Sequence, residues 1–291
     1  MKKTERQQKH LLPKVIHKTA VNVIDHQVSK SAAALTYYLL FAMFPLLIFI
    51  SNLLGLLDLD VRSITTALLP VLPDDIVYLM QAYLEHITQN SSPVLLGFSV
   101  FFTVWFPMRA VGGLMDDVRL AYQLGKPEKP IQYAIRQFLF TILFLVLIIV
   151  LLLLAILGRR FISTVMDWLE LDKLFTIPPV LLSLWQYLRF VLLAAIIFAI
   201  VGLLYATAQD HRQRARAIMP GVFLTLVSWL LVSIGFSAYV ENFANYSLIY
   251  GALGTVIVLL VWLYLTSFML ILGAEFNASI YSIRKELPDR D

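Results

Sequence analysis

A run of 20 residues without a charge, FLFTILFLVLIIVLLLLAIL at positions 138–157, constrains this chain more than any other feature. A helix needs about 20 apolar residues to cross the hydrocarbon core of a bilayer, so this run is long enough to span a membrane. The composition agrees, because 59% of the residues are hydrophobic and only 14% are charged, against about a quarter charged in soluble domains. We therefore expect an integral membrane protein.

Five further apolar runs bring the predicted membrane spans to six. The approximate bounds of all six are 31–57, 94–115, 138–157, 180–208, 217–240 and 248–274. The sequence thus predicts an all-α integral membrane protein with six transmembrane helices, in one membrane domain over residues 31–280. The chain has no cysteine, which excludes disulfides and thiolate chemistry.

Basic residues collect on one side of the predicted spans. Of the 23 lysines and arginines, 17 lie in the N-terminal segment, in alternate connections or in the tail over residues 281–291, and four lie in the other connections. Positive charge marks the cytoplasmic side of a membrane protein, so both termini are predicted to be cytoplasmic. The first 30 residues lack an apolar region followed by a small-residue cleavage site, so we expect no cleavable signal peptide.

Two segments outside the spans have helical patterns. In residues 1–30, apolar residues recur at helical spacing from Leu12 onward, with basic residues mostly between them; this predicts an amphipathic helix on the anionic inner leaflet or, alternatively, one packed on the cytoplasmic loops. Residues 58–92 are acidic and predict an external helical insert, capped by Asp74 or Asp75. The insert either covers the membrane domain or acts as a lid.

Arg109 is a charged residue within the second predicted span. A cation at that depth costs a few kcal/mol unless it snorkels to the headgroups or finds a partner. Two acids are candidates for pairing, Asp116 on the same helix and Glu275 near the inner end of the sixth span, where Asn277 also lies. Such a pair would form a gate or an anion site, whereas snorkelling would leave Arg109 without a functional role.

Several other residues predict helix kinks or close helix contacts. Proline within a span removes a backbone hydrogen bond, which produces a static kink or exposes carbonyl groups to a substrate, and glycine lets two helices approach closely. Tyr37 and Tyr38 either pack against a neighbouring helix or face an aqueous cavity. The remaining residues in this class are Pro45, Pro107, Gly112, Gly113, Tyr250, Gly251, Gly254 and Gly273.

Two stretches, SKSAAALTYYLLFAMFPLLIF at 29–49 and YGALGTVIVLLVWLYLTSFMLILGAEFNA at 250–278, resemble the signature regions of the YihY/BrkB family of bacterial inner-membrane proteins. The resemblance implies six helices in the bacterial plasma membrane and cytoplasmic termini. Members are labelled virulence factor and, historically, ribonuclease BN, and some are thought to move lipids or lipid-linked precursors. The resemblance implies that the residues matching the family pattern are of functional or structural interest: Tyr37, Tyr38, Pro45, Tyr250, Gly251, Gly254, Gly273 and Glu275.

The residues give no support to nuclease chemistry. Phosphodiester hydrolysis needs clustered metal ligands or a positioned acid and base, yet the five histidines are scattered and none stands in an HxH or HExxH pattern. We therefore predict that the protein is not an enzyme and has no catalytic residue, metal site or cofactor. Nucleic acid is not expected as a partner, because membrane topology already accounts for the basic loops.

Transport is the predicted function. An amphiphilic substrate, an anionic lipid or lipid-linked envelope precursor, would follow a pathway or gate formed by Arg109, Glu275, Asp116, Asn277, Tyr37 and Tyr38. The alternative is a non-transporting scaffold that recruits envelope-assembly proteins. Membrane lipids of the anionic inner leaflet are the expected partners in the first case, and the sequence does not specify an oligomeric state.

Overall fold

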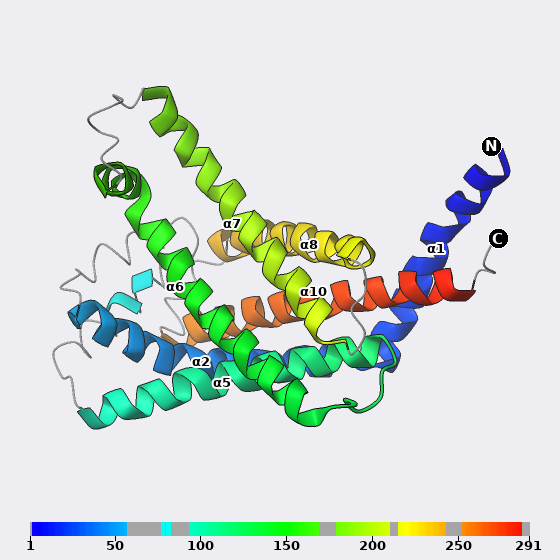
Figure 1. Cartoon of the computed structure of the whole chain (residues 1–291), viewed down its shortest axis with the longest axis horizontal. Helices are drawn as coiled ribbons and strands as arrows, with labels where there is room; N and C mark the ends of the chain where they lie inside the picture. Colours follow the sequence, from blue (N-terminus) through cyan, green and yellow to red (C-terminus); the bar gives the residue numbers. More distant parts are fainter. Residues whose placement is uncertain are drawn as a thin grey trace. The chain divides into compact units, whose positions relative to one another are not determined.

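The computed structural model describes residues 2–56, 77–78, 80–82, 93–168, 179–209, 215–242 and 252–286. All regular secondary structure in these residues is α-helical, as predicted. The long helices, in chain order, are α1 (Lys2–Asp25), α2 (Val28–Leu56), α5 (Pro93–Ala121), α6 (Pro130–Trp168), α7 (Pro179–Thr207), α8 (Ala215–Asn242) and α10 (Ala252–Glu286) (Figure 1).

Within the described residues, five helices are long and apolar enough to cross a membrane. Their candidate spans are Val28–Phe49, Gly97–Ala121, Pro130–Val150, Ala217–Val240 and Gly254–Lys285. A shorter apolar stretch, Val191–Thr207, lies in α7. Large apolar side chains on these helices are exposed, among them Phe223, Leu231 and Ile234 of α8. Such surfaces are unusual in soluble proteins and are typical of helices that face lipid.

Three helices extend beyond the predicted spans. Helix α5 continues to Ala121 rather than ending near residue 115, α6 begins at Pro130 rather than near 138, and α10 reaches Glu286. The added turns contain polar residues that pack against neighbouring helices, so a search for uninterrupted apolar runs does not include them. Of the predicted insert at 58–92, only residues 77–78 and 80–82 are described before α5, and these are helical.

The chain divides into two compact units. The first comprises Met1–Met43, Val104–Thr141 and Ile200–Asp291, and the second comprises Phe44–Thr103 and Ile142–Ala199. In the second unit, Pro45 of α2 is buried, and the rings of Phe98 and Phe102 lie 4.2 Å apart on α5. The first unit contains Arg109, Glu275 and the other predicted pathway residues.

Helices α1 and α2 are joined by a two-residue turn at His26 and Gln27. Gln27 has a φ of 53°, in the left-handed region that commonly ends a helix and that glycine adopts more readily. The turn is closed by hydrogen bonds from the His26 N–H to the Asn22 carbonyl at 2.8 Å and from the Lys30 N–H to the Gln27 carbonyl at 2.8 Å. The tight turn fixes the position of His26, and α1 packs against α10, crossing its C-terminal part (Figure 1).

Helices α8 and α10 cross with almost no space between their backbones. A Cβ atom added to Gly273 would lie 1.8 Å from Thr225 Oγ1, and one added to Gly221 would lie 2.3 Å from the Gly273 carbonyl oxygen. The amide of Asn277 accepts a hydrogen bond from the Gly221 N–H at 2.7 Å and donates one to the Ile218 carbonyl at 2.5 Å. The Tyr205 hydroxyl, from α7, contacts Thr225 Oγ1 at 2.9 Å and the Leu270 carbonyl. Three helices therefore meet at Gly273.

The substitution Gly273→Ala is expected to destabilise the protein by about 1–3 kcal/mol, the usual cost of overpacking a tight contact, because Thr225 has to move. The measurement is the thermal unfolding midpoint of the purified protein in detergent. Gly113→Ala is the matched control, since Gly113 is a helical glycine with nothing within 4 Å of the position that a Cβ atom would take, and alanine there favours the helix. An equal response of the two variants would contradict the close contact.

Candidate functional site

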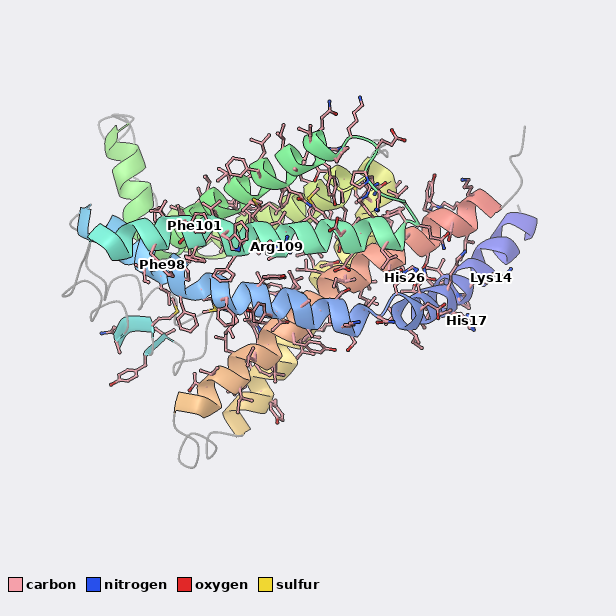
Figure 2. All side chains as sticks on the ribbon, turned by 90° about the horizontal axis from the view of Figure 1, so that it is seen from below. Lys14, His17, His26, Phe98, Phe101 and Arg109 are labelled. Carbon is pink, nitrogen blue, oxygen red and sulfur yellow. The ribbon has the colours of Figure 1, made fainter. Side chains whose placement is uncertain are left out.

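Arg109 lies on α5 and is exposed at the surface of the first unit (Figure 2). Its guanidinium carbon is 5.8 Å from the centre of the Tyr38 ring on α2, which is within the range of a cation–π contact worth about 0.5–1 kcal/mol at an exposed site. The neighbour of Arg109 is thus an aromatic ring. Among the described residues, neither Asp116 nor Glu275 forms an ion pair with it.

An aromatic strip runs beside Arg109. Its members are Tyr37, Tyr38, Phe41 and Phe106: the Tyr37 ring is 5.4 Å from Tyr38 and 4.6 Å from Phe41, and Phe41 is 5.7 Å from Phe106. Tyr37 is 52% exposed. One cation and exposed aromatic rings therefore share the face formed by α2 and α5.

Glu275 occupies a different environment from Arg109. It is 1% exposed, and its Oε1 atom lies 2.6 Å from Nδ1 of His26 in the α1–α2 turn. Its other carboxylate oxygen, Oε2, has no hydrogen-bond partner in the described part of the chain. Asp117 on α5 and Asn22 on α1 face the same carboxylate. The predicted pathway residue Glu275 is thus the centre of a buried polar cluster.

Asp116 belongs to a third group of residues. It is exposed and accepts a hydrogen bond from the Tyr133 hydroxyl at 2.8 Å. The Tyr133 ring has Arg119 at 5.3 Å and Arg136 at 5.9 Å from its centre. Asn277, another predicted pathway residue, binds the backbone of α8 through its side-chain amide.

Arg119 and Arg136 cap the C-terminal end of α7. Arg119 donates to the Ala208 carbonyl at 3.2 Å and to the Gly125 carbonyl at 2.7 Å. Arg136 donates to the carbonyls of Thr207 at 3.2 Å and Gln209 at 3.3 Å. Guanidinium groups are favourable there because the last carbonyls of a helix have no partner within it and carry partial negative charge.

In the sequence, Arg119 and Arg136 are two of the basic residues that indicate the cytoplasmic side of the membrane, and they suggest no further role. The one local signal is the spacing of Tyr133 and Arg136, which places them on the same helix face.

Nearby, burial raises the pKa of Tyr122 to about 12, so this hydroxyl is neutral at physiological pH. The Tyr122 ring lies 5.9 Å from the Tyr281 ring.

The remaining predicted residues have diverse surroundings. A Cβ atom on Gly112 would lie 3.3 Å from the Gln137 side chain, whereas Gly113 faces open space. Pro107 and Gly254 are buried. Tyr250 and Gly251 fall outside the described residues. In the part of the chain that the structure describes, no group of three or more His, Asp or Glu residues is arranged to hold a metal ion.

Comparison with known proteins identifies the relatives of the chain. The family model described as Virulence factor BrkB matches residues 19–290. The chain belongs to this family. It is 29% identical over 266 residues to a protein of Bacillus subtilis (strain 168) named as ribonuclease-like, YfkH, covering 91% of this chain and 94% of that relative.

Other relatives match only a part of the chain. UPF0761 membrane proteins of Xanthomonas campestris pv. campestris (strain B100) and Xanthomonas oryzae pv. oryzae (strain PXO99A) are each 36% identical over 90 residues, which is 31% of this chain and 21% of theirs. No solved structure matches the chain significantly. The family and the apolar helices together establish a multi-pass protein of the bacterial plasma (inner) membrane.

The substitution Arg119→Gln is expected to destabilise the protein by about 1–3 kcal/mol, because it leaves buried carbonyls without a donor. Lys126→Gln is the matched control: it removes one positive charge from the same connection, but Lys126 is exposed. Thermal unfolding in detergent provides the measurement. If both variants unfold at the wild-type temperature, the cap on α7 contributes nothing to stability.

Proposed function

We propose that this BrkB-family protein moves an amphiphilic, anionic lipid or lipid-linked envelope precursor, as a transporter or flippase-like protein. The observation that carries the proposal is the exposed Arg109 on an apolar helix, beside the aromatic strip of Tyr37, Tyr38, Phe41 and Phe106. An exposed cation on a membrane span is costly, and an anionic headgroup is the natural ligand that offsets this cost.

The chemistry of Arg109 suits such a headgroup. A guanidinium binds phosphate through two parallel hydrogen bonds and is more weakly hydrated than an ammonium group. Exposed aromatic rings contact the glycerol or sugar part of an amphiphile, while its acyl chains stay in the surrounding lipid. A site on an open helix face therefore fits a lipid better than a small polar solute, which needs an enclosed pocket.

The proposed topology has six spans with both termini in the cytoplasm. Helix α7, 29 residues long, supplies the sixth span. Helix α1 lies on the inner leaflet through an apolar strip of Leu12, Ile16, Ala20 and Ile24, all exposed and four residues apart, with the exposed Lys14 beside it. The opposite side of α1, with Val15 and Thr19 buried, packs against α10.

We also propose that the protein is not an enzyme. The name of the B. subtilis relative suggests ribonuclease activity. The carboxylates and the imidazole that lie near one another are Asp117, Glu275 and His26; Glu275 is buried between helices, and the other two are partly buried. A nuclease needs its metal ligands or its acid and base at a surface that a polynucleotide can reach.

The substitution Arg109→Ala is expected to slow the movement of a labelled anionic lipid by about tenfold or more, since a charge-assisted hydrogen bond contributes about 1.5–3 kcal/mol. The assay reconstitutes the protein in vesicles with fluorescent phosphatidylglycerol and measures how fast the inner-leaflet label becomes accessible to an external quencher. Arg109→Lys keeps the charge and should retain intermediate activity.

Two controls define the outcome. Lys126→Ala removes an exposed charge outside the spans and should leave the rate unchanged, and labelled phosphatidylcholine tests headgroup selectivity. If the wild type moves phosphatidylglycerol no faster than protein-free vesicles do, the transport proposal fails. Capture of envelope-assembly proteins would then be the activity to examine.

A further inference from the structure

The contact between His26 and Glu275 joins two parts of the chain that are 249 residues apart in sequence. A separation of 2.6 Å between Nδ1 and Oε1 is typical of a charge-assisted hydrogen bond. His26 is in the turn that ends α1 and begins α2, and Figure 2 shows it at that corner, beside α10. The contact therefore fastens the α1–α2 turn to α10.

The carboxyl group of Glu275 is buried, and only one of its two oxygens has a hydrogen-bond partner in the described residues. The side chain is 1% exposed, and Oε2 has no partner among the described residues. A buried carboxylate is stable only when its oxygens are paired. Oε1 has His26 as its partner, whereas Oε2 is left without one, and a proton on Oε2 would remove the unpaired charge.

The neighbours of Glu275 come from α1, the α1–α2 turn and α5. His26 in the turn bonds to its carboxylate, Asn22 on α1 lies beside it, and Asp117 on α5 faces it electrostatically. Asp117 in turn faces Ser31 on α2 and Asp116 on α5. The Glu275 carboxylate thus has one imidazole as its hydrogen-bond partner and one carboxyl group, Asp117, as an electrostatic neighbour, and a bound proton relieves the repulsion between the two carboxylates.

We propose that Glu275, with His26 and Asp117, forms a proton-binding site that holds the α1–α2 turn on α10 when empty and releases it when a proton binds. In the empty state the His26 ring donates a hydrogen bond from Nδ1 to the Glu275 carboxylate. A proton taken from the cytoplasmic water binds Oε2. The His26 ring then faces a neutral carboxyl group, and the hydrogen bond between them is weaker than one to a carboxylate.

Release acts on the turn and on the end of α1 that precedes it, because α2 keeps other hydrogen bonds to α10. The start of α2 has further bonds to α10, from Ser29 Oγ to the Tyr264 hydroxyl at 2.7 Å and between Thr36 Oγ1 and Ser267 Oγ at 3.5 Å. Helix α1 has the apolar strip of Leu12, Ile16, Ala20 and Ile24 on its other side. Proton binding thus alters how the helix proposed to lie on the membrane surface is held on the membrane domain.

The first experiment measures the proton directly. Infrared difference spectra of the full-length protein in nanodiscs, between alkaline and mildly acidic pH, should show carbonyl absorption of protonated carboxyl groups. The Glu275 component should be absent from Glu275→Gln and present both in Asp117→Asn, which removes any contribution of Asp117, and in the control Asp25→Asn, which removes an exposed carboxylate beside the turn. A band that persists unchanged in Glu275→Gln would overturn the proposal.

Two further variants keep the test decisive if Glu275→Gln does not fold. His26→Ala removes the hydrogen-bond donor that favours the ionised carboxylate, so the midpoint of the Glu275 band should move to higher pH, and Asp117→Asn removes a like charge, so the midpoint should move to lower pH. Midpoints that stay at the wild-type value in both variants would show that these groups do not share a site.

The second experiment measures the release of the turn. After correction for the intrinsic rate, amide hydrogen exchange in residues 19–30 of the wild type should rise at least tenfold on acidification. In Glu275→Gln it should be fast at every pH, because a neutral amide reproduces the protonated state. Exchange in the wild type that does not change with pH would contradict the release.

The use of this proton to drive transport rests on the function proposed above. With the vesicle assay, Glu275→Gln should lose the dependence of the rate on a pH gradient and Arg109→Ala should lose transport at every pH. If the wild type does not transport lipid, the proposed function is refuted, whereas the infrared evidence for the proton site is unaffected. An absent infrared band would refute the proton site and leave transport standing.

Discussion

The backbone contact between α8 and α10 at Gly221 and Gly273 is the constraint on which the rest of the first unit depends. The hydrophobic effect does not drive two helices together inside a bilayer, so close packing and polar contacts have to do so. At this crossing the helices approach closely enough for Asn277 to bond the α8 backbone. Glu275 is two residues earlier on α10 and is held in register by the same contact, with its carboxyl group toward the α1–α2 turn.

The polar residues of α10 have two kinds of role: some bind neighbouring helices, and Glu275 is the proposed proton-binding residue. Thr266 accepts a hydrogen bond from the Trp229 indole at 3.3 Å, and Asn277 is fully engaged with α8. These groups have partners that satisfy them, as buried polar groups in low-dielectric surroundings require. Glu275 differs, because one oxygen is bonded and the other is left without a partner in the described residues. The Ser279 hydroxyl on the same helix is also buried without a partner among the described residues, but a hydroxyl is neutral, whereas the carboxyl group of Glu275 can take up a proton.

Local patterns in the sequence predict where the helices lie, but they do not predict which residues of different helices are in contact. The apolar runs predicted the helices because hydropathy and length act on each segment by itself. The partner of Glu275 was not predicted, since His26 precedes it by 249 residues and is, in the sequence, one of five scattered histidines. Arg119 and Arg136 were missed for a related reason. The positive-inside rule already explains basic residues at the membrane surface. The sequence therefore gives no reason to expect that these two arginines also bind the end of α7.

The arginine cap on α7 also bears on how the protein is assembled in the membrane. The carbonyls of Thr207 and Ala208 depend on donors from α5 and α6, which leave the ribosome earlier. When the last turn of α7 arrives, its binding partners are already present, so this end of the helix is never left without donors at the membrane boundary. The order of synthesis and the order in which polar groups become satisfied therefore coincide.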